Sequence, residues 1–270
     1  MAEYLMRENA PLKEDEWSHL DDLVAETARR ILVGRRVVPL FGPLGAAVQT
    51  VPVGTFGGVG PGTSGKPVRQ VDRKYLVLQE ITKDFILNWQ DIEAARSGIM
   101  PMHLGPAAAA AATCAVAEDT LIFRGDKGIE GLMTVKGRLE SPMGDWAAKG
   151  AFGDITAALQ KLQENSFPDH YALVVSPAGY AQMQRPYGNT GALEIALVRE
   201  LVTDGVYQTP VLKPSEAVLI ATGPQNMDLA VGIDLSVAYL DTEDMDHRFR
   251  VVETLALRVK QPTALCTITK

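Results

Sequence analysis

Residues 49–79 read QTVPVGTFGGVGPGTSGKPVRQVDRKYLVLQ, and this stretch decides the fold. An extended apolar run at Val48–Val53 leads into the Gly- and Pro-rich segment Gly54–Pro67, after which Val68–Leu78 alternates like a strand. Glycine and proline at this density exclude a helix and leave the backbone many accessible conformations. The pattern predicts a long hairpin with a flexible tip, which is an arm that reaches away from a folded body.

The tip also contains two patterns that are typical of nucleotide-binding loops. Gly60–Gly65 fits G-x-G-x-x-G, and Gly60–Lys66 fits G-x-x-x-x-G-K. Both mechanisms need a helix to begin at the loop, because the amides at its N-terminus bind the phosphate. Here Pro67 stands where a Ser or Thr would hold magnesium, and a strand pattern follows. The pattern therefore favours an assembly arm over an enzyme that acts on nucleotides.

A helix is predicted on each side of the arm. Glu14–Val33 is amphipathic, begins with acids and ends with arginines before a capping glycine. Its apolar stripe comprises Trp17, Leu20, Val24, Ala28, Ile31 and Leu32. The end of this stripe fits either the protein core or a groove for an apolar peptide. Pro106–Glu118 starts with proline and continues in alanines, which predicts a buried helix that neighbouring elements approach closely.

The rest of the chain mixes helices and strands without a regular βαβ repeat, which predicts the α+β class. Short strands and turns are expected at Thr120–Phe123 and Gly128–Met133. The predicted helices are Asp91–Ser97, Phe152–Glu164, Pro177–Met183 and Ala192–Thr203. The predicted strands are Tyr171–Ser176, Val206–Leu212, Ala217–Ala221, Asp228–Ala238 and Phe249–Val259. In the last strand Phe249, Val251, Leu255, Leu257 and Val259 face one way.

The composition is that of an ordinary globular protein, with 270 residues, 46% hydrophobic and 22% charged. A formal net charge of −7 argues against nucleic acid as the main partner, because phosphate binding needs clustered Lys and Arg. The N-terminus lacks the apolar core of a targeting signal, and no stretch reaches the roughly 18 apolar residues of a membrane helix. Cys114 and Cys266 match no metal or redox spacing and are expected to be buried thiols. We expect a cytoplasmic protein without a membrane partner.

The sequence offers no recognisable catalytic constellation. Its four histidines form no H-E-x-x-H motif, and no G-x-S-x-G element is present. The acidic cluster Asp241–His247 could bind a metal, but an acidic solvated turn between two strands explains it better, so no metal site is predicted. Trp89 could stack on an aromatic ligand or anchor a core or an interface.

Several blocks, taken together, resemble the shell proteins of encapsulin nanocompartments, the Linocin-M18-like family. They cover nearly the whole chain in order: APLKEDEWSHLDDLVAETARRILVGRRVV, GPLGAAVQTVP, KDFILNWQDIEAARSG, AEDTLIFRGD, GIEGLMTVKGRL, HYALVVSPAGYAQM, LEIALVRELVTDGVYQTPVL, NMDLAVGIDLSVAYL and HRFRVVETLALRVKQPTALCTI. The chain looks most similar to the myxobacterial and firmicute shells that enclose ferritin-like, iron-oxidising cargo.

The resemblance implies a fold like that of the HK97 phage capsid protein, many copies of which build a closed icosahedral shell. It divides the chain into an N-terminal helix with the start of a peripheral domain (1–48), an extended loop (49–79), the peripheral domain with its long helix (80–144), an axial domain (145–223) and peripheral return strands (224–270). The shell subunit would have no catalysis of its own and would enclose cargo for iron storage and protection from oxidative stress.

The resemblance also implies two functional surfaces. Family shells capture cargo through a short C-terminal targeting peptide, and the matching residues here are Ala28, Ile31, Leu32, Arg35, Ile233, Asp234 and Leu235. Arg35 and Asp234 would fix the register of the peptide, and Leu32→Asp is expected to give empty but intact shells. The pore at a symmetry axis would be lined by Arg185, Pro186, Tyr187, Gly188, Asn189, Thr190 and Gly191.

No cofactor is expected in the shell subunit. Some family members bind a flavin near the tryptophan that matches Trp89, but Ile81 stands here where those members have a helpful basic residue. Two alternatives to an iron-storage shell remain. One is a phage-type major capsid protein, although the chain starts directly at its amphipathic helix rather than at a scaffolding segment. The other is a shell for a peroxidase cargo.

Overall fold

The first sheet of the subunit is built around one long strand. The computed structural model describes residues 3–53, 74–188 and 191–270, so the tip segment Gly54–Pro67 lies outside the described residues. Strand β13 (Asp246–Val259) pairs on one side with β12 (Ser236–Glu243) and then β11 (Met227–Val231), and on the other with β4 (Gln79–Leu87). The two-residue strand β1 (Leu40–Phe41) adds to β11 in parallel.

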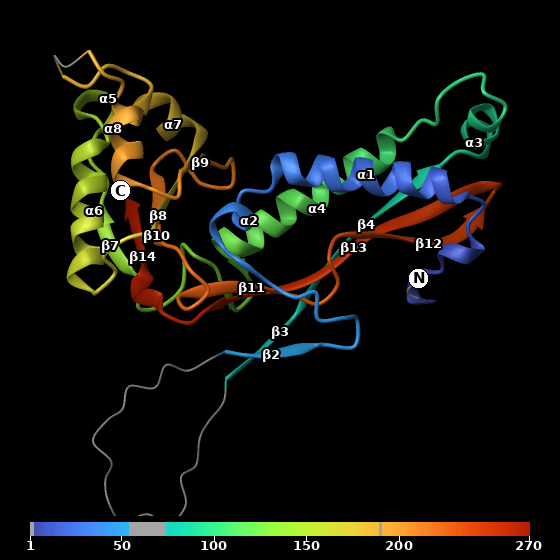
Figure 1. Cartoon of the computed structure of the whole chain (residues 1–270), viewed down its shortest axis with the longest axis horizontal. Coiled ribbons are helices and arrows are strands. Elements are labelled where there is room, and N and C mark those ends of the chain that lie inside the picture. The colour runs from blue at the N-terminus through green and yellow to red at the C-terminus, as the bar shows by residue number, and fades with distance from the viewer. Residues whose placement is uncertain (1–2, 54–73, 189–190) are drawn as a thin grey trace, which may run out of the picture.

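Two long helices cover one face of this sheet (Figure 1). They are α1 (Glu14–Ile31) and α4 (Gly105–Arg124). The apolar stripe of α1 meets alternate residues of β13, and the ring of Trp17 stands edge-on to Phe249 at a centroid distance of 5.7 Å. The prediction of an amphipathic helix that covers an apolar surface is thus confirmed.

The alanines of α4 explain how closely the two layers pack. Ala107, Ala110, Ala111 and Ala115 are all at most 2% exposed, because a side chain of one methyl group lets the neighbouring backbones approach. Among the described residues α4 is also the one helix long and apolar enough to cross a membrane by length and composition, a feature that the sequence analysis did not anticipate. In its most apolar window 56% of the residues are buried inside the protein, as in a core helix.

A second sheet forms the other end of the molecule. Its strand order is β7 (Leu139–Pro142), β14 (Leu265–Thr269), β10 (Glu216–Ala221), β8 (Tyr171–Val175) and β9 (Val206–Gln208). The helices that surround it in Figure 1 are α5 (Trp146–Lys149), α6 (Phe152–Glu164), α7 (Pro177–Met183) and α8 (Glu194–Leu201). All five residues of β8 are buried, since the strand lies inside the sheet with both faces covered.

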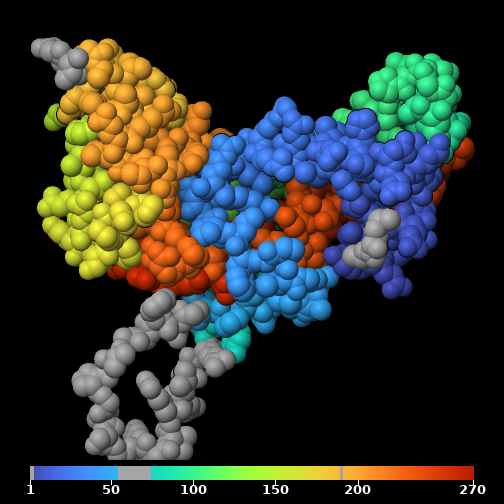
Figure 2. Space-filling model, in the orientation of Figure 1, coloured from blue at the N-terminus to red at the C-terminus, as the bar shows by residue number. Residues whose placement is uncertain are grey.

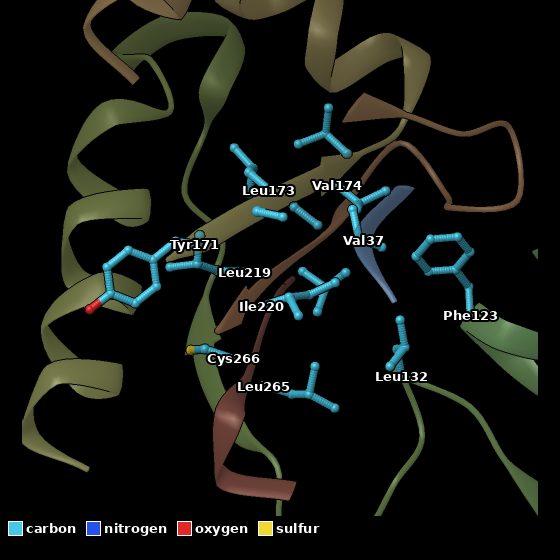
Figure 3. Close-up of a cluster of buried hydrophobic side chains, with 14 of the residues drawn as sticks. Val37, Phe123, Leu132, Tyr171, Leu173, Val174, Leu219, Ile220, Leu265 and Cys266 are labelled. Carbon is cyan, nitrogen blue, oxygen red and sulfur yellow. The ribbon is translucent and has the colours of Figure 1, made fainter. Parts of the chain in front are cut away.

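One hydrophobic core joins the two ends of the molecule. Figure 3 shows Val37 and Phe123, from the helical layer, close to the side chains of β8 and β10. Val37 belongs to the short helix α2 (Gly34–Val37), and Phe123 lies in the last turn of α4. Both are at most 2% exposed, so the two sheets share a common core.

The remaining elements are short. They are the 3-10 helices η1 (Glu3–Leu5), η2 (Arg7–Asn9) and η3 (Pro262–Ala264), helix α3 (Trp89–Arg96), and strands β2 (Thr50–Pro52), β3 (Tyr75–Val77), β5 (Gly125–Asp126) and β6 (Ile129–Glu130). Strands β2 and β3 form an antiparallel pair in which Val51 faces Leu76. This pair is the root of the predicted arm, and in Figure 2 its light-blue and teal surface lies at the lower edge of the subunit.

The structure corrects two sequence-based expectations. Thr120–Phe123 is the last turn of α4 and not a strand, because helical spacing buries Ile122 and Phe123 in the shared core. Asp228–Ala238 is two strands, β11 and β12, separated by a turn at residues 232–235. The last strand, β14, pairs with β10 and β7 in the second sheet. The five-part division of the chain stays a prediction.

Candidate docking and pore sites

The predicted docking residues of α1 lie at its C-terminal end, against α4. Ala28 and Leu32 pack on Ala115 and are only 2% and 6% exposed. Ile31 and Leu235 are half-buried at the edge of the same cluster. The structure therefore brings Ala28, Ile31, Leu32 and Leu235 together. Ala28 and Leu32 belong to the core, whereas Ile31 and Leu235 form the surface that a partner could contact.

Ile233 lies on the opposite side of the sheet. It lines an open groove of about 790 Å³ together with Val252 and Thr254, and its backbone N–H donates to Thr254 Oγ1 at 2.8 Å. The residues of β12 and β13 that face this groove alternate with those that face α1 and α4. Ile233 is thus separated from the surface formed by Ile31 and Leu235.

Arg35 is the centre of a buried ionic network rather than a free surface charge. Its Nε and Nη2 donate to the two carboxylate oxygens of Glu118 at 2.7 and 2.9 Å, and Nη2 also donates to Glu253 at 3.0 Å. Nη1 donates to Asp234 at 2.7 Å. Glu118 and Glu253 have fully buried side chains, whereas Asp234 is 53% exposed. Arg35 and Asp234 are therefore bonded to each other directly beside Ile31 and Leu235.

This network holds three carboxyl groups around one guanidinium, so its net charge would be −2 if all three were ionised. Burial, together with the neighbouring Glu118, raises the pKa of the Glu253 carboxyl to about 9. Among the residues described, Oε1 of Glu253 is the one buried side-chain polar atom without a hydrogen-bond partner. A proton on this carboxyl halves the excess negative charge and leaves the buried pair of Arg35 with Glu118 balanced, and a hydrogen bond with Glu118 contributes to the raised pKa.

Glu253→Gln is expected to stabilise the subunit at neutral and alkaline pH. With its pKa raised to about 9, the Glu253 carboxyl stays protonated in the folded protein at neutral pH, whereas in the unfolded chain it ionises near the ordinary glutamate pKa of 4.5. Its contribution to stability is therefore fully present below about pH 4.5 and is lost as the pH rises through 9. Chemical denaturation of both proteins at several pH values should show the variant gaining on the order of 1–3 kcal/mol above neutrality. A parallel pH dependence in both proteins would contradict a bound proton.

Sequence reasoning missed Glu118 and Glu253, although both gave a signal. Glu253 occupies the one place left out of the apolar alternation from Phe249 to Leu257. Glu118 follows Cys114 and Ala115 by four and three residues, which puts it on the buried side of α4. An acid at a core-facing position indicates a buried cationic partner.

The predicted pore segment is a narrow loop between α7 and α8, and its residues Asn189 and Thr190 lie outside the described part of the chain. Pro186 and Leu193 form an isolated bridge, and the backbone N–H of Tyr187 donates to the carbonyl of Ala192 at 2.9 Å. Arg185 donates to the carbonyls of Trp146 and Ala147, at 2.6 Å each. The Arg185 guanidinium therefore binds the backbone of α5. Gly188 and Gly191 are exposed in the loop.

Trp89 is the first residue of α3, and its backbone N–H donates to Asp246 at 3.3 Å. Ile81 lies near the other end of β4, where it pairs with Glu253 and packs against the core. Six residues of extended strand separate Ile81 from Leu87, which is roughly 20 Å. Within one subunit a residue at position 81 is therefore not placed to assist a ligand at Trp89.

The titratable side chains of residues 3–53, 74–188 and 191–270 do not gather into a metal site. They contain no group of three or more His, Cys, Asp or Glu arranged to hold an ion. The cluster Asp241–His247 is the hairpin turn between β12 and β13, as expected. Cys114 and Cys266 are buried free thiols, and burial raises the pKa of both.

Comparison with known proteins gives a consistent result. A family model described as "Encapsulating protein for peroxidase" (Linocin_M18) matches residues 1–256. The chain is 48% identical to a type 1 encapsulin shell protein of Myxococcus xanthus, covering 99% of this chain and 97% of that protein. It is 25% identical to a ferritin-like–encapsulin shell fusion protein of Pyrococcus furiosus, over 56% of this chain and 42% of the fusion.

Solved structures show the same fold at low sequence identity. A virus-like particle from Pyrococcus furiosus aligns with a TM-score of 0.75 and 20% identity, covering 93% of this chain and 98% of that chain. The capsid of Myoviridae phage XM1 aligns with a TM-score of 0.64 and 13% identity, covering 87% and 89%. The fold is therefore the HK97-like capsid fold.

Proposed function

The chain belongs to the Linocin-M18 family of encapsulin shell proteins, and from this premise we propose that its shell encloses a ferritin-like, iron-oxidising cargo protein in the cytoplasm. The subunit itself is a structural protein and not an enzyme. Its 48% identity to the Myxococcus xanthus shell protein over almost the whole chain carries the part of the proposal that concerns the shell. The existence of a relative in which a ferritin-like protein is fused to the shell supports it, because fusion and capture both place cargo inside.

We propose that a C-terminal peptide of the cargo docks on the exposed edge formed by Ile31 and Leu235. An apolar peptide side chain would cover the two half-buried residues, and its backbone amides could donate to the exposed carboxylate of Asp234. Arg35 holds Asp234 in place, so it acts as a positioning residue. Ile233 lies on the other face of the sheet and is not part of this edge.

Two further proposals complete this function. Iron would enter through the pore loop that includes Gly188 and Gly191. The subunit would bind no flavin, because Ile81 offers no basic side chain where the flavin-binding members have one. The description of the family model favours a second candidate, a shell for a peroxidase. The phage-capsid alternative rests on fold alone, at 13% identity.

Isolation of native shells tests the cargo proposal. Protein released from them should be a ferritin-like protein that oxidises Fe(II), and the particles should contain iron. A haem peroxidase as the main content would instead establish the second candidate, and packaged DNA of defined length would establish a capsid. Bound flavin in particles washed free of cargo would contradict the absence of a cofactor.

Ile31→Asp is expected to reduce cargo content at least tenfold while shells still form, because a charge on the docking edge opposes an apolar peptide. Ala25→Asp is the matched control, since Ala25 is exposed on the same helix away from the edge. Leu32→Asp is a poor probe, because Leu32 is only 6% exposed and the change would put a carboxylate into the core. Equal cargo content in the Ile31 variant and the control, measured by gel densitometry of purified shells, would place the docking site elsewhere.

A further inference from the structure

A hollow of about 840 Å³ lies at the root of the arm, between β3, the β5–β6 turn and the end of β13. Its floor is apolar and includes Leu121, Val135 and Leu257, each at most 7% exposed. Two large apolar side chains of the arm, Tyr75 and Val77, line it and are 55% and 60% exposed. Apolar surface of this kind at the base of a protruding element is typical of a contact site.

Three lysines line the hollow, and each comes from a different segment. Lys74 precedes β3, Lys127 lies in the β5–β6 turn, and Lys136 follows α4 in the loop toward β7. All three are exposed, and none forms an ion pair with any residue that the structure describes. Glu130 is the one acid among the lining residues. The hollow therefore presents excess positive charge around an apolar floor, which suits a partner that is acidic and apolar together.

The turn between β12 and β13 of the same chain is a protrusion that is both acidic and apolar. At this turn, Met245 is 58% exposed and stands between Asp244 and Asp246. The carboxylates of Asp241 and Glu243 are 55% and 69% exposed nearby, and both pair with Arg248, at 3.5 and 3.4 Å, so that the acids of the turn still outnumber its arginine. Asp244 and Met245 have φ angles of 51° and 72°. A two-residue turn of this type is most easily made by glycine or asparagine, so turn geometry does not account for a methionine there.

The turn cannot reach the hollow of its own subunit. Asp246 begins β13, and Leu257, on the floor of the hollow, lies eleven residues further along the same strand, which corresponds to about 36 Å. Figure 1 shows the β12–β13 turn and the arm at well-separated places along the sheet. Any contact between them joins two copies through different surfaces, and repeated contacts of that kind generate rings and closed shells.

We propose that the β12–β13 turn of one subunit inserts Met245 into the lysine-lined hollow at the arm root of a second copy. Asp244, which forms no ion pair with any residue that the structure describes, then pairs with the lysines Lys74, Lys127 and Lys136, the remaining negative charge of the turn adds to the attraction, and the methionine covers the apolar floor. This inference rests on the assembly of the chain into a shell, and it names one of the contacts that holds neighbouring subunits together.

The proposed contact is tested with variants of the full chain in which the charges on one or both of its two sides are reversed. Lys127→Glu with Lys136→Glu, or Glu243→Lys with Asp244→Lys, should each raise the protein concentration needed for particle formation roughly tenfold, as expected for a loss of about 1.4 kcal/mol per contact. All four changes in one chain should restore assembly. Failure of the combined variant to recover, or unchanged assembly in both double variants, would overturn the contact. If the unaltered chain formed no particles in sedimentation, the shell function itself would fail instead.

A disulfide provides a second measurement that does not depend on how the charge variants fold. Asp244→Cys combined with Lys127→Cys should form covalent oligomers in oxidised particles, and the two native thiols, being buried, give little background. Asp244→Cys combined with Lys149→Cys is the matched control, since Lys149 is exposed on α5 in the other end of the subunit. Monomers in both, or equal oligomers in both, would count against the contact.

Discussion

Arg35→Met is expected to lower the free energy of unfolding of the subunit by about 3–5 kcal/mol, which is the usual cost of removing one partner from a buried ion pair. The guanidinium is 16% exposed and serves the fully buried carboxyl groups of Glu118 and Glu253. Methionine fills a similar volume but donates no hydrogen bond. Two acids would then remain in the core without a cation, so the loss should be seen as a lower denaturation midpoint of the unassembled subunit.

Arg36→Met is the control for this prediction. Arg36 is exposed and donates only to the carbonyl of Arg29, so its loss should change stability by about 0.5 kcal/mol or less. Adding Glu253→Gln to Arg35→Met should recover part of the lost stability, because a glutamine is neutral without having to bind a proton on folding. Arg35 and Arg36 variants of equal stability would mean that the network is solvated rather than buried.

Arg258→Met is expected to impair shell assembly more than its cost in folding stability accounts for. The guanidinium of Arg258 pairs with both oxygens of Asp228 at 2.6 and 2.8 Å, and its Nη1 donates to the carbonyl of Pro52 at 3.1 Å. It thereby ties β2, at the root of the arm, to the first sheet. The lost hydrogen bond to the arm is worth only about 1 kcal/mol in one subunit, but the loss recurs in every copy of a shell. Sedimentation should show mainly unassembled subunits.

Lys260→Met distinguishes the ion pair that Arg258 forms with Asp228 from the hydrogen bond that Arg258 donates to Pro52. Lys260 also pairs with Asp228, at 2.7 Å, but it contacts the carbonyl of Pro224 and not the arm. Its loss should lower stability without disturbing assembly. If both variants assembled alike at matched stability, the hydrogen bond to Pro52 would have no part in orienting the arm.

Local sequence patterns predicted much of this fold, because buried apolar residues recur along the chain with the period of a helix or of a strand. Helices α6 and α7 have the bounds that were predicted, since apolar spacing and a proline at the helix start define them locally. The turn between β11 and β12 was missed because an apolar run continues on both sides of Gly232. The end of α4 was missed because Ile122 and Phe123 have strand-like propensity, and only the shared core decides in favour of a helix.

The surroundings of the residues in the proposed docking site were harder to predict, because they depend on contacts between distant parts of the chain. Arg35 lies 83 residues from Glu118 and 218 from Glu253, so no local sequence pattern shows that its guanidinium is paired with these two acids. The helical period places Ala28, Ile31 and Leu32 on one side of α1, but it does not say which of them α4 covers. Ile233 lies within the turn at residues 232–235, where its backbone N–H donates to the hydroxyl of the distant Thr254.

The position of β14 inside the second sheet, between β7 and β10, has a consequence for the order of events during protein synthesis. The other four strands leave the ribosome first, and β14 follows β10 by roughly 40 residues, a delay of some seconds at ordinary translation rates. Until then β7 and β10 lack the strand that joins them. A nascent subunit therefore cannot complete this sheet early, which delays its association with neighbours on the same messenger RNA until translation has passed residue 269.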